Sequence, residues 1–304
     1  SKCAPIVYRW CIYQIIIPAL TKDILLTEVT PFYINELLDK CKETVHNCCA
    51  FMAKKCITEI LYSAIAEELI SPFPFDEITE YAMNSKKYVF WKQNDIECFF
   101  KLAQTGNCYL EYLLVFFLGL ETGELLGLKF SNINFKEKEL TICQVLVKDD
   151  IKEKIRPLSR ETGYRTIKIP DLVITELKKR KKINRFLFKS NPNMAKKWKN
   201  YVCIGERGNV KSQAVLNKWL KEYCQETNVP RTNLRDLRRL CTLNLLEDGN
   251  SLEFIAHQLH YSSVLSILEI YCNFLGKDEN HKNSRLDSIV FSANDSIQNS
   301  SVKN

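Results

Sequence analysis

The segment 232–275 constrains this chain most, because it combines an arginine pair, Arg235 and Arg238, and the phenol of Tyr271 with a clear helical pattern. Arg235 and Arg238 stand three positions apart, so one helix presents both on the same face. Apolar residues recur at the helical period up to Gly249, which is a typical helix stop. A second apolar stretch ends at Tyr271. The segment therefore predicts packed helices that carry basic side chains and a tyrosine in one domain.

Length and charge indicate two domains and an anionic partner. The chain has 304 residues, of which 46% are hydrophobic, and this suits two domains with cores of ordinary size. The net charge of +7 is uneven, because residues 1–90 hold 9 Lys and Arg against 11 Asp and Glu. The remainder holds 34 against 25, which favours a polyanion partner for the second part. A solvated, lysine-rich surface is the alternative.

Cysteine and histidine usage argues against a metal site. The 13 cysteines include no CxxC pair, and Cys48 and Cys49 are adjacent rather than at ligand spacing. None of the four histidines stands in a Cys/His cluster, so we interpret the cysteines as reduced, core-filling thiols of a cytoplasmic protein. We expect neither metal nor cofactor. No apolar run reaches the ~18 residues that span a bilayer, so we expect no membrane segment.

The first 85 residues read as a helical domain. Residues 7–17 predict a helix that Pro18 ends, and Thr30 with Pro31 predicts the start of the next one. A third helix is expected over 48–69, before a proline break at 70–75, with a linker at about 76–92. The abrupt start at SKCAPIVYRW indicates that a further segment, such as an arm-binding domain, lay upstream or has been lost.

Residues 86–276 predict a second domain of helices with a small β-hairpin or sheet. The fold class is therefore mainly α, with an α+β second domain. Its expected helices cover 95–106, 108–120, 172–182 and 211–227, with a further helix and turn over 123–135, and its strands cover 138–147 and 164–170. The tail 277–304 is polar and is expected to be disordered. Its apolar island at Leu286 and 289–291 either docks on a neighbouring subunit, forming a homo-oligomer, or packs on its own domain.

Several lysines are candidates for contact with a nucleic-acid backbone. The run KKRKK at 178–182 either binds phosphates by counterion release or is the solvated end of a helix. Cations next to aromatic residues at 196–201 are typical of loops that bind a backbone. The candidate DNA-binding residues are Lys42, Lys54, Lys55, Lys86, Lys87, Lys196, Lys197 and Lys199.

Four segments, taken in order and spacing, resemble the tyrosine recombinases, the family of phage and conjugative-transposon integrases. They are YLLVFFLGLETGELLGLKFSNINF, PLSRETGYRTIKIP, NLRDLRRLCTLNLLEDG and IAHQLHYSSVLSILEIYCNFL. The resemblance covers roughly residues 8–275. It implies a core-binding domain at 1–85 and a catalytic domain at 86–276, which together clamp double-stranded DNA and recombine it at specific sites.

The resemblance assigns roles to four residues. Tyr271 falls on the nucleophile that attacks a DNA phosphate, and Arg238 on an arginine that holds this phosphate. Arginines are needed there because charge builds on the non-bridging oxygens in the transition state. Arg235 would supply a second cation, and His260, one residue out of register, could still reach the phosphate.

Other positions depart from the family pattern. Glu121 stands where the family has its first arginine, and Ser159 where it has a lysine. Arg235 replaces a histidine and cannot act as an acid near pH 7. His260 and Tyr261 fall on the glycine and histidine of a further motif.

Stand-ins for the missing lysine exist if the hairpin shifts its register, namely Lys154, Arg156 and Arg160. The sequence thus predicts a recombinase-like protein whose strand cleavage is impaired. Its alternative is a catalytically inactive DNA-binding protein of the same fold, either a decayed mobile-element gene or a regulator. A helical scaffold with no nucleic-acid role is a third reading. The sequence leaves open whether the protein is an enzyme.

Overall fold

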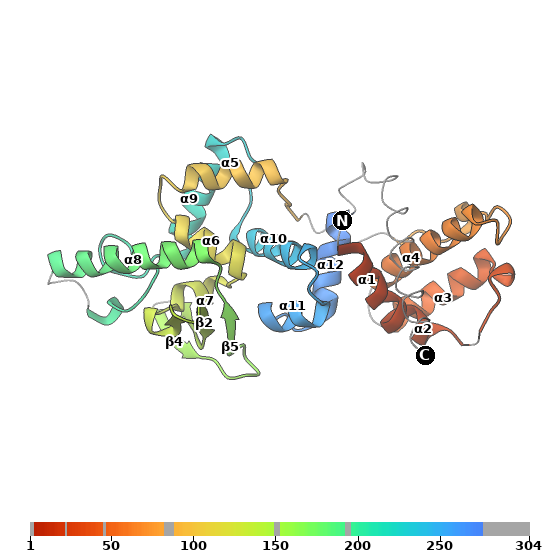
Figure 1. Ribbon diagram of the computed structural model, residues 1–304, viewed down its shortest axis with the longest axis horizontal. Helices are drawn as coiled ribbons and strands as arrows, with labels where there is room; N and C mark the ends of the chain where they lie inside the picture. The colour runs from red at the N-terminus through yellow and green to blue at the C-terminus, as the bar shows by residue number, and fades with distance from the viewer. Residues whose placement is uncertain are drawn as a thin grey trace, which may run out of the picture. The chain divides into compact units, whose positions relative to one another are not determined.

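The computed structural model describes residues 3–21, 23–44, 47–81, 88–148, 153–191 and 196–275 (Figure 1). These form two compact units. The first combines the described residues up to Tyr88 with Leu245–Ala256 and the described residues from Tyr261 onward, and the second comprises Val89–Asn244 and His257–His260. The fold is mainly α with small antiparallel sheets, which confirms the predicted fold class.

The first unit starts with a broken helix. Its segments are α1 (Cys3–Cys11), η1 (Ile12–Ile16), which is π-helical, and α2 (Ile17–Ala19). The predicted stop at Pro18 is wrong, because the chain stays helical to Ala19. The π-helical turn just before Pro18 shifts the pattern of backbone hydrogen bonds. Pro18, which has no backbone N–H, therefore lies in the first turn of α2, where a helix tolerates proline.

Three further helices complete the core of the first unit. They are α3 (Pro31–Thr44), α4 (Asn47–Ala66) and α12 (Val264–Leu275), and α4 packs against both others and α1. The start of α3 is as predicted, since the Thr30 hydroxyl accepts from the Tyr33 N–H at 3.2 Å. Short 3₁₀ turns, η2 (Leu26–Glu28) and η3 (Phe75–Glu77), flank α3 and α4 in the chain. Most of the thiols predicted to fill the core do so, and Cys11, Cys41, Cys49, Cys56 and Cys272 are at most 2% exposed. The prediction is wrong for Cys98, which is exposed, and for Cys143, which is only half-buried.

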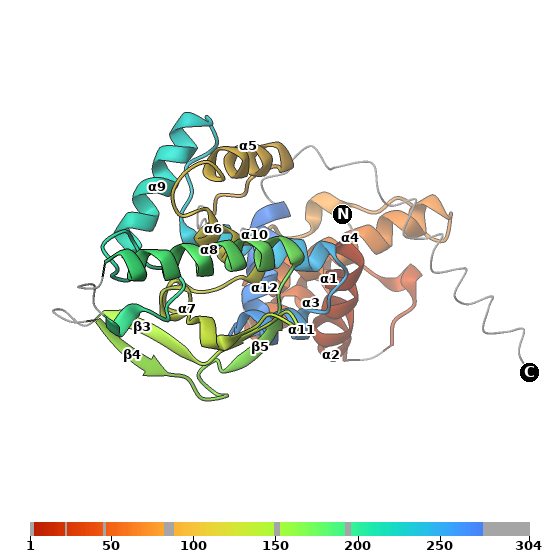
Figure 2. The same ribbon diagram turned by 60° about the vertical axis from the view of Figure 1, so that its left-hand side comes forward.

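A largely apolar, buried helix occupies the middle of the second unit. Helix α6 (Tyr109–Leu118) lies between α5 (Gln93–Ala103) with α9 (Gln213–Glu226) and the strands, as Figures 1 and 2 show. It ends at Gly119, whose φ of +63° suits glycine. A Cβ at Gly119 would also collide with the Leu259 side chain, so this position fixes a close approach between the ends of α6 and α11 (Leu252–Leu259).

The strands form two antiparallel sheets. After α7 (Thr122–Gly127) and η4 (Phe130–Asn132), the first sheet has the order β1 (Ile133–Asn134), β2 (Glu139–Ile142) and β5 (Arg165–Lys168), and the second pairs β3 (Gln144–Lys148) with β4 (Glu153–Pro157). The strand predicted over 138–147 is therefore wrong as one element, because it breaks at Cys143. The two halves share one alternating pattern, and only their pairing with β5 and β4 separates them.

Helix α8 (Asp171–Ser190) is longer than predicted, and the KKRKK run lies in its middle. The end expected at Lys182 is wrong because Asn184 is buried and its amide donates to the carbonyls of Tyr201 and Val202 at 3.0 and 3.3 Å. The 3₁₀ turn η5 (Lys196–Trp198) follows, then α9, which the Ser212 hydroxyl caps as predicted, and α10 (Leu234–Glu247). None of the helices in the described ranges is long and apolar enough to cross a membrane.

Candidate functional site

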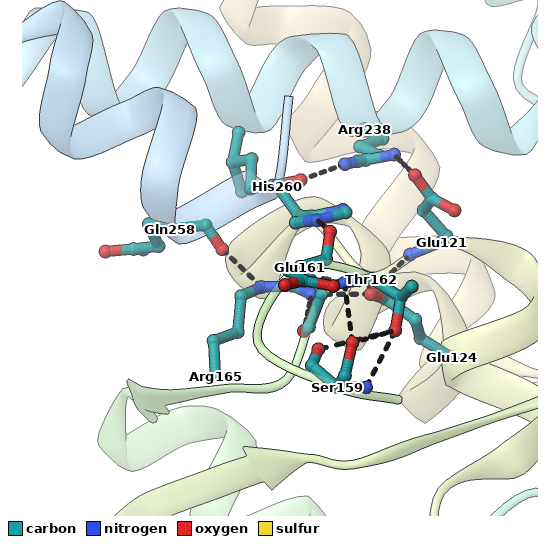
Figure 3. Close-up of polar contacts among 11 residues, drawn as sticks. Glu121, Glu124, Ser159, Glu161, Thr162, Arg165, Arg238, Gln258 and His260 are labelled. Carbon is teal, nitrogen blue, oxygen red and sulfur yellow. Dashed lines mark hydrogen bonds and ion pairs between the residues drawn. The ribbon is translucent and has the colours of Figure 1, made fainter. Parts of the chain in front are cut away.

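Arg238 is held by two oxygens of its own unit. It lies on α10, whose first turn is capped by Asn233, since its side-chain oxygen accepts from the N–H groups of Arg235 and Asp236 at 2.9 and 3.0 Å. The Arg238 guanidinium lies 2.6 Å from the Glu121 carboxylate and also donates to the Leu259 carbonyl (Figure 3). The side chain is 11% exposed, so its guanidinium has a fixed position at the edge of the unit.

Glu121 stands at the start of α7, in the place where the resemblance expects an arginine. Its N–H donates to the Glu124 carboxylate at 2.9 Å, which closes a capping box. The Glu121 side chain is 52% exposed, and a half-exposed ion pair contributes only about 0–1 kcal/mol. An incoming anion can therefore displace Glu121 from Arg238 at small cost, but the negative charge of Glu121 remains beside it.

A buried ion pair beneath this contact was not singled out from the sequence. The two terminal nitrogens of Arg165 each donate to one oxygen of the Glu124 carboxylate, at 2.6 and 3.0 Å. Both side chains are less than 5% exposed. Arg165 also donates to the carbonyls of Gln258 at 2.7 Å and Gly163 at 3.0 Å. It thus fixes α7, the start of β5 and the end of α11 to one another (Figure 3).

The sequence held a signal for this pair. In the run YRTIKIP, Arg165 alternates with Ile167 and Ile169 on the same side of the strand, and all three are buried. A charged residue in register with the apolar side of a strand needs a buried partner, because an isolated buried charge is very costly. The position of Arg165 therefore predicts a buried acidic partner, and in the structure this partner is Glu124.

Ser159 uses its polar groups within its own turn. Its N–H donates to the Thr162 hydroxyl at 2.7 Å, the two hydroxyls are 3.1 Å apart, and its carbonyl accepts from the N–H of Tyr164 at 2.8 Å. No cation stands at this position. Of the stand-ins, Lys154 and Arg156 lie on β4 opposite Val147 and Val145, and Arg160 is exposed in the turn.

His260 lies against the same turn. It follows α11 with a φ of +52°, and its Nε2 is 3.4 Å from the Glu161 carbonyl oxygen. Its ring covers Gly163, where an added Cβ would lie 3.2 Å from the His260 Nδ1. The structure therefore brings Arg238, Glu121, the Ser159 turn and His260 together around the Arg165–Glu124 pair (Figure 3).

Three other candidate residues have different surroundings. Arg235 is exposed on the first turn of α10. The neighbouring acid, Asp236, pairs with Arg239. Tyr261 is half-buried and belongs to the first unit, and its N–H donates to the Ala256 carbonyl at 2.9 Å. Tyr271 also belongs to the first unit.

Tyr271 lies on α12 and is 1% exposed. Tyr271 lies near Tyr8 of α1. Burial is the main cause that raises the pKa of the Tyr8 phenol, and the nearby Tyr271 raises it further. The next residue, Cys272, is fully buried. The Tyr271 side chain thus has almost no contact with solvent.

The candidate DNA-binding lysines differ in exposure. Lys42, Lys197 and Lys199 are exposed, whereas Lys55 is half-buried and Lys54 pairs with Glu80 at 2.5 Å. The Lys197 ammonium lies 4.3 Å from the centre of the Trp198 ring. Lys86 and Lys87 lie outside the described residues, as does the tail 277–304, and the side chain of Lys196 is not described.

Metal-binding residues do not gather in the described part of the chain. Within those ranges, no group of three or more His, Cys, Asp or Glu side chains could hold a metal ion.

Comparisons with known proteins agree on one family. The model of the phage integrase family matches residues 90–276. A tyrosine recombinase XerC-like protein of Caldanaerobacter subterraneus subsp. tengcongensis is 29% identical over 179 residues, which are 55% of this chain and 46% of the relative. The ICEBs1 integrase of Bacillus subtilis is 19% identical over 236 residues, 77% of this chain and 64% of the relative. This chain thus spans less than two thirds of either relative.

A solved structure shares the fold. The Tn1549 transposon integrase in complex with transposon right-end DNA matches with a TM-score of 0.54, at 14% identity, over 95% of this chain and 92% of that one. At this identity the likeness shows the fold alone.

Proposed function

This chain belongs to the phage integrase family, the tyrosine recombinases, and from that premise we propose that it binds double-stranded DNA at a site of integration or recombination. Tyr271 occupies the nucleophile position and Arg238 the phosphate-binding position, with Arg235 as a second cation. Cleavage of the strand is impaired. The observation that carries this proposal is the 2.6 Å contact between Arg238 and Glu121.

The reaction needs no group from outside the protein and the DNA. The Tyr271 phenol loses its proton and attacks the phosphorus, which forms a 3′-phosphotyrosyl bond and breaks the bond to the 5′ oxygen. An acid returns a proton to that oxygen, and the reverse steps join a strand again. Two N–H groups of Arg238 would hold the non-bridging oxygens, where charge builds.

Impairment follows from what surrounds Arg238. Where the family has a cation, Glu121 brings a carboxylate that neutralises Arg238 and repels a phosphate. Ser159 donates hydrogen bonds within its own turn and is a poor acid for an alkoxide. His260 is exposed beside that turn, and its ring nitrogen lies 3.4 Å from the Glu161 carbonyl oxygen.

The alternative is a DNA-binding protein of the same fold that does not cleave. The same contacts favour it, because a phosphate-binding pocket without its first arginine and its lysine can still bind a strand. The burial of Tyr271 also favours it. The two proposals differ in one product, the covalent adduct between the protein and DNA.

A nicked suicide substrate tests which proposal holds. Such a substrate loses the short strand beyond the cut, so a covalent adduct accumulates and can be counted on a denaturing gel. We expect a small yield from the wild-type protein and none from Tyr271→Phe. Abundant adduct from the wild type would contradict the impairment, and equal adduct from Tyr271→Phe would remove Tyr271 as the nucleophile.

A repair variant tests the account of the pocket. Glu121→Arg with Ser159→Lys supplies both missing cations and should raise the adduct yield if Tyr271 can be reached. If no adduct forms with the repaired pocket, the non-cleaving alternative holds. Affinity for duplex DNA should fall steeply with salt in either case, and a flat response would remove DNA binding itself.

A further inference from the structure

Helix α8 carries a row of cations without ion-pair partners. Lys178, Lys182, Arg185 and Lys189 recur at spacings of four, three and four, so they form a straight stripe along one side of the helix. All four are exposed, and none of the ion pairs among the described residues includes them. The other three basic residues of the KKRKK run differ, because Lys179 pairs with Glu176, Arg180 pairs with Glu111, and the Lys181 ammonium lies 4.8 Å from the centre of the Phe135 ring.

A row of exposed apolar side chains runs beside this stripe. Ile183 is 60% exposed and Phe186 is 71% exposed, and each follows a cation of the stripe by one position. Leu172, eleven positions before Ile183 and on the same side, is 45% exposed. Figure 1 shows the second half of α8 projecting from the rest of the second unit.

The opposite side of α8 packs against the rest of the second unit. Val173, Ile174 and Leu177 are buried in the core of the second unit, and Asn184 binds the backbone at Tyr201 and Val202. The position of the helix is thus fixed, and its outward stripes have a constant geometry. Folding of this unit therefore does not explain why Ile183 and Phe186 are apolar.

We propose that these two stripes, the α8 surface, bind an acidic amphipathic helix of a partner protein. The cations require an anionic partner, and the apolar stripe requires one that also offers apolar side chains. Duplex DNA meets only the first requirement. A helix with carboxylates along one side and leucines along the next meets both, and it can lie parallel to α8 over the length of the stripes.

The test uses the full chain and a defined probe. The probe is a labelled synthetic helical peptide with Glu along one stripe and Leu along the adjacent stripe, and fluorescence anisotropy measures its binding. A peptide of the same composition in scrambled order is the reference. We expect Ile183→Ser with Phe186→Ser to weaken binding about tenfold or more, as removal of an interface hot spot does. Lys182→Ser with Arg185→Ser should weaken it to a similar extent.

A matched control lies on α9. Val215→Ser with Lys221→Ser also removes one exposed apolar and one exposed basic side chain, and it should leave peptide binding unchanged. Circular dichroism and thermal unfolding show whether each variant is folded, and all of these positions are exposed.

Three outcomes would overturn the proposal. The wild-type protein would bind the scrambled peptide equally well, or the Ile183/Phe186 variant would bind the ordered peptide like the wild type. Alternatively, the α8 variants would lose affinity for duplex DNA or for vesicles containing phosphatidylserine while peptide binding stays unchanged. That last result would assign the α8 surface to DNA or to a lipid surface instead.

Discussion

The Arg238 guanidinium lies 2.6 Å from the Glu121 carboxylate, so the cation that we propose holds a DNA phosphate is neutralised by an acid of its own unit. Glu121 is covalently fixed at the start of α7 and cannot diffuse away. A phosphate must compete with it at Arg238 and must also tolerate its charge. The contact therefore opposes phosphate binding by competition for Arg238 and by charge repulsion. The repulsion persists even after Arg238 has separated from Glu121.

Removal of the charge on Glu121 should strengthen DNA binding. Glu121→Gln keeps the shape of the side chain but deletes the anion, and a half-exposed pair of this kind is worth at most about 1 kcal/mol, or about fivefold in affinity. The measurement is the Kd for duplex DNA at fixed salt. Glu226→Gln, an exposed residue at the end of α9, is the control and should change little. Equal affinity of Glu121→Gln and the wild type would show that Glu121 does not oppose binding.

Loss of either member of the Arg165–Glu124 pair should destabilise the second unit. Both side chains are less than 5% exposed, and a buried charge left without its partner costs about 3–5 kcal/mol. Arg165→Met and Glu124→Gln are each expected to lower the free energy of unfolding by this order, as urea denaturation would measure. Arg160→Met, in the exposed turn before β5, is expected to stay within about 0.5 kcal/mol. Similar stability of all three variants would contradict a fixing role for Arg165.

Stability should depend on pH through Glu111. Burial disfavours the charged form of this carboxylate, but Arg180 and Lys211, each 2.8 Å away, outweigh burial and lower its pKa from 4.5 to about 2. Because the folded pKa lies below the unfolded one, the stabilisation is present above pH 4.5 and disappears as the pH falls toward 2. The shift corresponds to a loss on the order of 3 kcal/mol across this window.

A pH series of urea denaturation curves checks this dependence. Glu111→Gln cannot titrate, so its stability should change less between pH 4.5 and 2 than that of the wild type. The comparison uses the slope with pH, since the variant also leaves Arg180 and Lys211 unpaired and is less stable throughout. Parallel slopes for the two proteins would exclude Glu111 as the titrating group.

Gly163 should be intolerant of a side chain. Its φ is +112°, which L-residues rarely adopt, and a Cβ would lie 3.2 Å from the His260 ring. We expect Gly163→Ala to cost about 1 kcal/mol or more and to displace His260 from the Ser159 turn, which NMR of the imidazole would detect. Gly205→Ala is the control, because its added Cβ meets nothing closer than 3.9 Å. Equal unfolding free energies for both variants would contradict the strain at Gly163.

Local pattern was enough to place most helices, because their apolar residues recur at the helical period and their ends carry ordinary signals. Thr30, Ser212 and Gly249 are such signals, and the structure has helix ends beside all three. The pattern was insufficient at Pro18, at Cys143 and after Lys182. Each depends on a partner elsewhere: a π-helical turn, a second strand, or the backbone at Tyr201 that binds Asn184.

The candidate site divides in the same way. The sequence by itself determined which residue types stand at the family positions, including the acid at 121 and the serine at 159, because identity and spacing are written along the chain. Only the tertiary structure decided that Glu121 neutralises Arg238, that Arg165 and Glu124 lie buried beneath them, and that Tyr271 is 1% exposed. The physical reason is that ion pairing and burial depend on distances between side chains far apart in sequence, and those distances exist only after the elements have packed.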